Sequence, residues 1–330
     1  MSTDSAEPHW QIERLVDELR SSREAWRHKQ ARHRELGPRG FPSRAEVERL
    51  AADISGALFP QRLGPPDLGL HQEDYYVGHI LDGALNSLLG QLRLELRYSM
   101  REAGHRPEEI EIRARVIARD FADSLPAIRE ILDSDVEAAY AGDPAARSVD
   151  EVLLCYPCVS AIIHHRLAHR LHDLGAPLIA RLMSEIANSR TGIDIHPGAR
   201  IGRSFFIDHG TGVVIGETAV IGDRVRLYQA VTLGAKSFAA EADGSLRKGE
   251  ARHPSIEDDV IVYAGATILG RVIIGAGSVI GGNVWLTESL PPGSHVTQAS
   301  LTRDPAARSV PPWKVRRSTL PVGKINGGEA

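Results

Sequence analysis

Hydrophobic residues recur at every sixth position through the C-terminal part of the chain, between about residues 195 and 296. The clearest run of such lead residues is Ile256, Val262, Ile268, Ile274, Ile280, Leu286 and Pro292. A helix repeats about every 3.6 residues and a flat strand about every 2, so neither element alone explains a period of six. A parallel β-helix does explain it, because three six-residue segments make one triangular coil with the lead residues stacked inside.

An earlier tract keeps the same period but shifts by two positions near its middle. Its lead residues are Ile195, Ile201 and Ile207, then Ile215, Ile221, Leu227 and Leu233. Glycine often follows a lead residue, as at Gly202, Gly216 and Gly275, and is expected at corners where a positive φ is needed. The segment 235–251 is charged and irregular, which predicts a loop that protrudes from the prism.

The N-terminal part of the chain, positions 1–190, is predicted to be helical. Apolar residues at helical spacing indicate helices over 11–31, 47–58, 74–100, 107–124, 127–140, 148–154, 159–174 and 177–188. Ser43 and Glu46 form a capping-box pattern before the second of these helices. The chain is therefore predicted to be an α+β multidomain protein, with a helical domain (1–190), a β-helix of hexapeptide repeats (191–300) and a mobile tail (301–330).

Composition and charge exclude several classes of protein. The formal net charge is −4, and no basic block indicates a nucleic acid or an anionic membrane as partner. The apolar run at 260–287 is long enough to span a bilayer, but it belongs to the six-residue repeat, so no membrane span is expected. Cys155 and Cys158 are interpreted as packed, reduced thiols. The segment 1–8 shows no secretion signal, so a cytoplasmic location is expected.

Five short motifs are embedded in the repeat. They are DIHPG at 194–198, DHGTG at 208–212, IGETAV at 215–220, VTLG at 231–234 and RHP at 252–254. In kind and order they resemble the serine O-acetyltransferase family of hexapeptide-repeat acyltransferases, over about positions 130–300, and the long N-terminal region is similar to the subgroup with extended N-termini. The resemblance implies a left-handed coil that transfers acetyl from acetyl-CoA to the hydroxyl of L-serine. That reaction gives O-acetyl-L-serine and CoA, begins cysteine biosynthesis from serine, and uses no metal.

Transfer to a hydroxyl needs a base, because a protonated alcohol is a poor nucleophile. His209 is the candidate, since it follows Asp208 at a corner of the repeat where its ring can point outward. Asp194 comes earlier in the chain by nearly one coil of three six-residue segments. It is therefore predicted to orient the His209 ring and stabilise its protonated form.

The amino-acid substrate is a zwitterion, so its pocket is expected to pair both charges. Arg252 offers a planar fork for the carboxylate, Asp208 can accept from the ammonium group, and His253 can add a hydrogen bond. The resemblance assigns Arg252 and His253 to serine binding, and it adds Asp143 from the Asp-Pro-Ala motif at 143–145.

The resemblance also places acetyl-CoA in a groove between the coils of neighbouring subunits. The residues it assigns to the cofactor are Gly234, Ala235, Ala264 and Gly282, whose small size lets the thin pantetheine arm approach the backbone. It implies a homotrimer, or a dimer of trimers. The chain ends without the isoleucine-ended tail that docks in O-acetylserine sulfhydrylase, so a stable complex with that enzyme is not expected.

Three alternatives remain open. Another hexapeptide O-acetyltransferase, acting on a sugar or antibiotic hydroxyl, would use the same His209 but would not need Arg252. A metal enzyme of the γ-carbonic-anhydrase type needs three converging histidines, and the repeat has no close histidine pair among His196, His209, His253 and His295. A scaffold without activity would not explain the DHGTG and RHP motifs together.

Overall fold

The computed structural model describes residues 10–30, 40–102, 104–237, 241, 245–247 and 249–298, so the predicted tail at 301–330 lies outside the described residues. The helices are α1 (Ile12–Lys29), α2 (Arg44–Leu58), α3 (Pro60–Leu63), the 3-10 helix η2 (Leu70–Gln72), α4 (Glu73–Glu102), α5 (Pro107–Ala122), α6 (Leu125–Gly142), α7 (Val149–Cys155), α8 (Pro157–Asp173) and α9 (Pro177–Thr191). The predicted helices are confirmed, and α3 and η2 are additions.

The helix ends follow from local chemistry. The Ser43 hydroxyl accepts from the Glu46 N–H at 3.4 Å, and the Ser148 hydroxyl caps α7 in the same way at 3.0 Å. Gly192 ends α9 in the left-handed region at φ 69°, which glycine adopts without steric cost. From this point the chain enters the coil.

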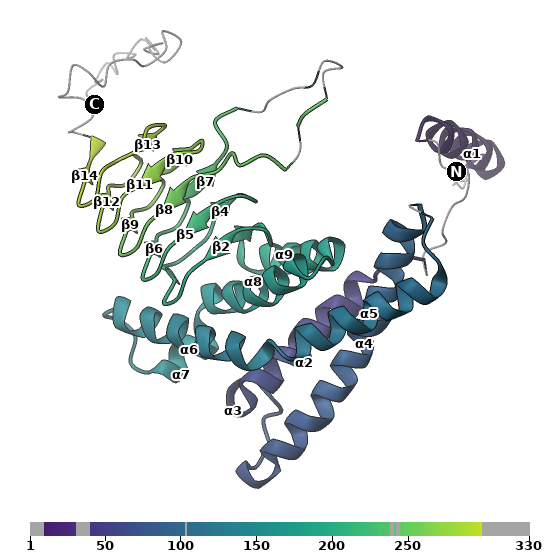
Figure 1. The fold of residues 1–330 in the computed structure, drawn as a ribbon, viewed down its shortest axis with the longest axis horizontal. Helices are drawn as coiled ribbons and strands as arrows, with labels where there is room; N and C mark the ends of the chain where they lie inside the picture. Colours follow the sequence, from purple (N-terminus) through teal and green to yellow (C-terminus); the bar gives the residue numbers. More distant parts are fainter. Residues whose placement is uncertain are drawn as a thin grey trace, which may run out of the picture.

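Short parallel strands form three sheets. They are β1 (Asp194–Ile195), β2 (Arg200–Ile201), β3 (Phe206–Ile207), β4 (Val214–Ile215), β5 (Val220–Ile221), β6 (Arg226–Leu227), β7 (Thr232–Gly234), β8 (Ser255–Ile256), β9 (Ile261–Val262), β10 (Thr267–Leu269), β11 (Ile273–Ile274), β12 (Val279–Ile280), β13 (Trp285–Leu286) and β14 (His295–Val296). The first sheet has the order β1-β4-β7-β10-β13, the second β11-β8-β5-β2, and the third β14-β12-β9-β6-β3. This is a left-handed parallel β-helix, as predicted (Figure 1).

The lead residues of the repeat fill the interior of the prism. In the first sheet Ile195, Ile215 and Leu233 lie in register and are buried. The first coil is two positions longer than the second, since Asp194 pairs with Val214, whereas Val214 pairs with Thr232. The shift of two positions in the sequence pattern is therefore an enlarged turn between β3 and β4, which contains His209.

The glycines that follow lead residues serve a different purpose from the one predicted. The prediction of positive φ is wrong for them, because Gly202, Gly216 and Gly275 are not among the residues with positive φ. Instead, a Cβ on Gly275 would clash with the backbone nitrogen of Pro292 in the next coil. These glycines let successive coils stack closely, and corners of the prism also place non-glycine residues such as Arg224 in the left-handed region.

A buried ion pair joins the helices to the first coil. Asp135 of α6 and Arg166 of α8 lie 3.0 Å apart, with side chains 3% and 7% exposed. Arg166 also donates to the carbonyls of Ile201 and Gly202, while Asp135 accepts from the Phe205 N–H at 2.9 Å. Because both charges are paired and hydrogen-bonded, this contact fixes α6 and α8 against the prism, beside which they lie in Figure 1.

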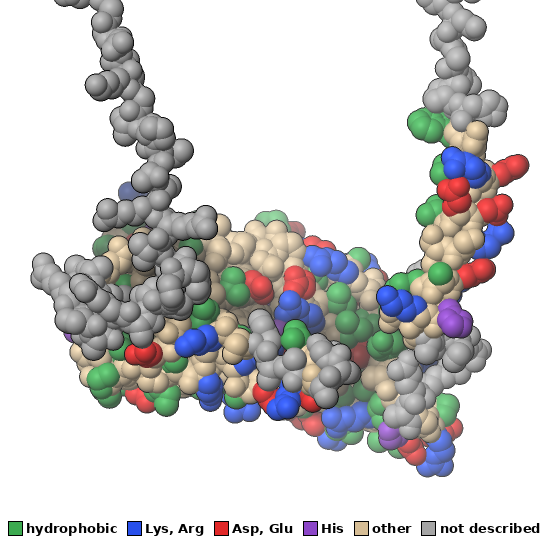
Figure 2. Space-filling view, turned by 90° about the horizontal axis from the view of Figure 1, so that it is seen from above, with side chains coloured by type: hydrophobic (Ala, Val, Ile, Leu, Met, Phe, Trp, Pro, Cys, Tyr) green, Lys and Arg blue, Asp and Glu red, His purple; other side chains and the backbone are tan. Residues whose placement is uncertain are grey.

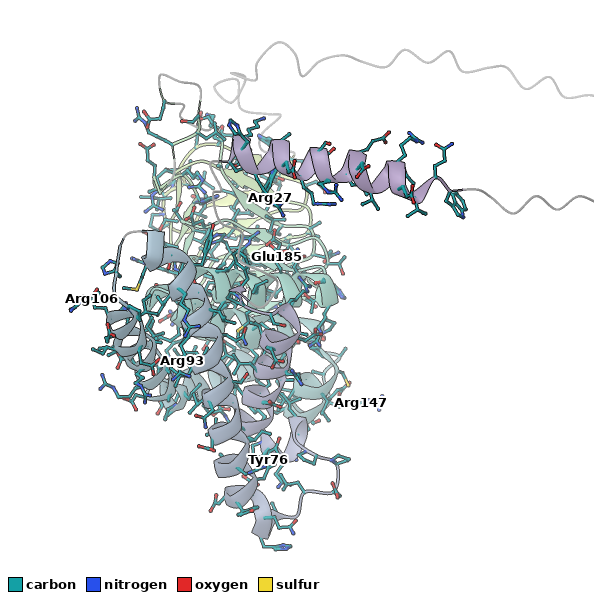
Figure 3. All side chains as sticks on the ribbon, turned by 90° about the vertical axis from the view of Figure 1, so that its right-hand side faces the viewer. Arg27, Tyr76, Arg93, Arg106, Arg147 and Glu185 are labelled. Carbon is teal, nitrogen blue, oxygen red and sulfur yellow. The ribbon has the colours of Figure 1, made fainter. Side chains whose placement is uncertain are left out.

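The remaining helices pack mainly on one another. Arg93 of α4, labelled in Figure 3, makes two hydrogen bonds of 2.7 Å to Glu111 of α5. Helix α1 has no buried residue, and in Figure 2 it stands apart from the body with charged side chains of both signs. No helix in the described part of the chain is both long enough and apolar enough to cross a membrane.

Candidate active site

The predicted site residues lie along two edges of the prism. We call the His209 edge the edge between the third and first sheets, made of the residues that follow β3, β6, β9 and β12. We call the Arg252 edge the edge between the first and second sheets, made of the residues that follow β4, β7 and β10. One side of the prism, formed by the first sheet, separates the two edges.

His209 projects into solvent from the enlarged first turn. Its side chain is 72% exposed, and its Nε2 lies 3.9 Å from a carboxylate oxygen of Asp208, whose side chain is 19% exposed. His209 has φ 59°, but other corners of the coil have similar values, so this conformation reflects the turn geometry of the coil. The ring is free to meet a substrate that approaches from outside the prism.

Asp143 reaches the same edge from the end of α6. The Tyr156 hydroxyl donates to one of its carboxylate oxygens, and the Ala145 N–H donates to the other at 2.8 Å. These two bonds hold the pKa of Asp143 below its usual range, and the nearby charges of His209 and Arg226 act in the same direction. The bond to Asp143 also raises the pKa of Tyr156 to about 12. Asp143, Asp208 and His209 therefore form one cluster.

Asp194 lies on the outward face of the first sheet, beside α9. Burial raises the pKa of its carboxyl group, against the opposing charge of Arg181. No hydrogen bond or ion pair among the described residues joins Asp194 to His209, and the enlarged first coil places Asp194 in register with Val214 rather than with His209. Its role as the partner of His209 stays a prediction.

Arg252 and His253 are brought together on the other edge, just before β8. Arg252 Nη2 donates to Glu217 Oε2 at 2.6 Å, and the two side chains are 26% and 31% exposed. Burial alone would raise the pKa of Glu217, but the bond and charge of Arg252 outweigh it and hold the pKa below its usual range. Arg252 also lines a cavity of about 300 Å³ with Lys236, Arg247 and Arg271. Glu250 lines the same cavity and pairs with Arg247 at 3.2 Å, which leaves an excess of positive charge.

The predicted cofactor residues divide between the same two edges. Ala264 and Gly282 are stacked on the His209 edge, where a Cβ on Gly282 would lie 3.2 Å from the Ala264 carbonyl oxygen. Gly234 and Ala235 lie on the Arg252 edge, at the end of β7, where the Gly234 carbonyl accepts from the Gly270 N–H at 3.0 Å. Within one chain, the predicted serine-binding residues and the predicted cofactor residues are therefore each divided between the two edges.

Three residues that contact the predicted ones are absent from the sequence-based predictions. Tyr156 donates to Asp143, Glu217 accepts from Arg252, and the Thr218 hydroxyl accepts from the Arg252 N–H. In the sequence, Tyr156 only precedes a predicted helix, and nothing there indicates that its hydroxyl meets an aspartate. Glu217 and Thr218 lie inside the IGETAV motif, which supports the resemblance but indicates no chemistry by itself.

The two cysteines differ in their surroundings. Cys158 is buried as predicted, and burial raises the pKa of its thiol to about 12. Cys155 is exposed at the end of α7, so the prediction that it is packed is wrong.

Comparison with known proteins decides the family. A model of the bacterial transferase hexapeptide (six repeats) matches residues 253–288. A serine acetyltransferase of Synechococcus elongatus is 55% identical over 267 residues, which cover 80% of this chain and 84% of that protein. The chain belongs to the serine acetyltransferase family.

Solved structures of serine acetyltransferases share the fold. Serine acetyltransferase 1 of Entamoeba histolytica, solved in complex with L-cysteine, has a TM-score of 0.65 at 36% identity, over 76% of this chain and 86% of that chain. The Neisseria gonorrhoeae enzyme, solved in complex with serine, has a TM-score of 0.50 at 27% identity, over 75% of this chain and 94% of that chain. The resemblance to serine O-acetyltransferases is confirmed. This chain is an acyltransferase, and serine O-acetylation is its activity.

A histidine beside the Arg252 edge is expected to make the stability of the protein depend on pH. Burial lowers the pKa of His196 to about 4 from its usual value of 6.5, helped by the charge of Arg181. Its Nδ1 accepts from the Gly198 N–H at 3.0 Å, which requires that this nitrogen carry no proton. The unfolded chain takes up the proton first, so this contribution to stability is complete above about pH 6.5 and is lost as the pH falls towards about 4.

We therefore expect the thermal midpoint of the wild-type protein to fall over this range, and to fall less steeply in a His196→Asn variant. Parallel melting curves from pH 7 to pH 4 check this difference. Equal slopes for the two proteins would show that the fold does not hold His196 in its neutral form.

Proposed function

We propose that the chain carries out this serine O-acetylation with acetyl from acetyl-CoA, at sites formed between neighbouring copies in a homotrimer. Within one chain, the His209 cluster and Arg252 lie on different edges of the prism, with the first sheet between them. Each side of the prism is a six-residue segment, and an extended chain rises about 3.3 Å per residue. One side is therefore much longer than serine, whose hydroxyl and carboxylate are only a few bonds apart. Packing the His209 edge of one copy against the Arg252 edge of the next completes the site.

In this proposal the two edges divide the binding of serine. Arg252 pairs with the carboxylate through its planar fork, and Glu217 holds that fork in place. Asp143 and Asp208 of the neighbouring copy accept from the ammonium group. The serine hydroxyl then lies against the exposed ring of His209.

His209 acts as the general base in this scheme. Its ring removes the hydroxyl proton as the serine oxygen forms a bond to the acetyl carbonyl carbon. When the carbon–sulfur bond of the tetrahedral intermediate breaks, the proton on His209 passes to the leaving sulfur, and CoA leaves as the thiol. Asp194 is proposed to stabilise the charged ring.

Acetyl-CoA is proposed to lie along the same groove. Gly234 and Ala235 would face Ala264 and Gly282 of the neighbouring copy, so that small residues on both walls admit the pantetheine arm. Positive charge near the phosphate groups would come from the basic side chains that line the cavity beside Arg252. The helical domain would position Asp143, and the enzyme would work in the cytoplasm at the entry to cysteine biosynthesis.

The supporting observation is that the predicted serine-binding residues and the predicted cofactor residues are both divided between the same two edges. The direct test of the acceptor substrate is CoA release from acetyl-CoA with L-serine, L-threonine, L-homoserine and a panel of sugars. We expect release with L-serine to exceed release with any sugar by at least about 100-fold, because sugars lack a carboxylate for Arg252. Comparable rates with a sugar would favour the alternative of a sugar O-acetyltransferase.

Arg252→Lys is expected to raise the KM for serine by about tenfold or more while leaving the KM for acetyl-CoA nearly unchanged. Lysine keeps the charge but loses the two-pronged geometry. Arg224→Lys is the matched control, because Arg224 makes a two-pronged contact with Asp259 at 2.7 and 2.9 Å on the remaining edge of the prism. Steady-state kinetics with each substrate varied give the comparison, and equal increases in both KM values would place Arg252 away from the serine carboxylate.

A further inference from the structure

Thr218 contacts both proposed serine-binding residues of the Arg252 edge. Its hydroxyl oxygen accepts from the backbone N–H groups of Arg252 at 2.9 Å and His253 at 3.1 Å. The same hydroxyl lies 2.9 Å from His253 Nδ1. A threonine hydroxyl has two acceptor positions and one donor, so these three contacts use its full capacity.

The backbone of Thr218 also determines the tautomer of His253. The Thr218 N–H donates to His253 Nδ1 at 3.0 Å, and an N–H group can only donate. Nδ1 is therefore the acceptor of the ring, and in the neutral ring the proton is on Nε2. A second proton on Nδ1 would point at the Thr218 N–H, so the neutral form is favoured. In agreement, burial lowers the pKa of His253, and the adjacent charge of Arg252 lowers it further.

The ring of His253 is held in one place. His253 is 7% exposed, and its ring lies directly over Gly216, where a Cβ would clash with Nε2. Arg271 donates to the carbonyl oxygens of Thr218 and His253 at 3.3 and 3.2 Å, which ties the two segments together again. Within the described residues, Nε2 has no hydrogen-bond partner, so its N–H is available to a ligand.

We propose that Thr218 is a positioning residue for serine binding. Its hydroxyl sets the backbone from which Arg252 extends, and its hydroxyl and N–H together fix His253 as an Nε2–H donor. Thr218 itself does not touch the substrate. This inference rests on the proposed serine site, and it assigns to Thr218 the alignment of the fork of Arg252 with the donor of His253.

The test compares two variants. Thr218→Val keeps the size and the backbone N–H but removes the hydroxyl, whereas Thr218→Ser keeps the hydroxyl and removes only the methyl group. We expect Thr218→Val to raise the KM for serine by about 10- to 100-fold, with the KM for acetyl-CoA changed less than about twofold, because two backbone donors lose their acceptor. Thr218→Ser should return the KM for serine to within about threefold of the wild-type value.

Ser278→Ala is the matched control for a general loss of stability. Ser278 is fully buried, and its hydroxyl accepts from the Ser294 N–H at 3.1 Å at a corner distant from both site edges. The substitution should lower the melting temperature without separating the two KM values. All variants are compared as folded oligomers of wild-type size.

The outcomes separate this inference from the proposed function. If the wild-type protein releases CoA with serine and Thr218→Val keeps a wild-type KM for serine, Thr218 is not a positioning residue. The same conclusion follows if both KM values rise together, or if Thr218→Ser is as impaired as Thr218→Val. A wild-type protein without activity on serine would instead overturn the proposed function itself. If Thr218→Val does not fold, Thr218→Ser and Thr218→Ala carry the same comparison.

Discussion

His209→Ala is expected to lower turnover by about 10²–10⁴-fold, which is the usual contribution of a positioned general base. The serine hydroxyl is almost wholly protonated near neutral pH, so its attack on a thioester needs proton removal during the same step. The ring of His209 is exposed to solvent, where it can meet a substrate, and it lies beside Asp208 and close to Asp143.

The fold should survive this substitution, because a side chain that is 72% exposed contributes little packing. We therefore expect the His209→Ala protein to keep its oligomeric size and its affinity for acetyl-CoA. His295→Ala is the matched control, since His295 is an exposed histidine on the last strand of the coil, β14. Single-turnover measurement of CoA release gives the comparison, and a folded His209→Ala protein with near-normal turnover would rule out His209 as the base.

The fold was predictable in detail because the repeat is a strong local signal. A period of six determines which residues face inward, and the buried positions of Ile215, Leu233 and Ile268 agree with it. Helix positions followed from apolar spacing and from caps such as Ser43. The buried pair of Asp135 and Arg166 was not predictable, because the two residues belong to different helices and only the packed structure brings them together.

Sequence motifs indicate residues for the candidate site, but they do not indicate how those residues are arranged. His209, Asp208 and Arg252 stand out because their motifs are unusual within the repeat. Their separation onto two edges depends on which sheet each strand joins, and this requires the register of every coil from β1 onward. The position of Asp194 relative to His209 depends on the same register, because the first coil is longer than a regular coil of three six-residue segments.

The proposed homotrimer predicts the second large effect, which is seen when two inactive variants are mixed. His209→Ala and Arg252→Ala should each have little activity alone at a serine concentration near the wild-type KM, because each variant damages every site of its own trimer. In a trimer that contains both variants, one site takes His209 from a copy that still has it and Arg252 from a neighbour that still has that residue. The other sites lack at least one of the two side chains, so a mixed trimer should regain about a third of the wild-type activity.

This complementation is the most direct test of a site shared between neighbouring copies. The two variants are co-expressed with different affinity tags, the mixed trimers are isolated through both tags, and CoA release with L-serine is measured. Pairing His209→Ala with a His209→Ala/Arg252→Ala double variant is the control, and it should restore nothing. Recovery to about a third of wild-type activity is the predicted result. Mixed trimers no more active than the two separate variants would contradict the shared site and place His209 and Arg252 in the active site of a single chain.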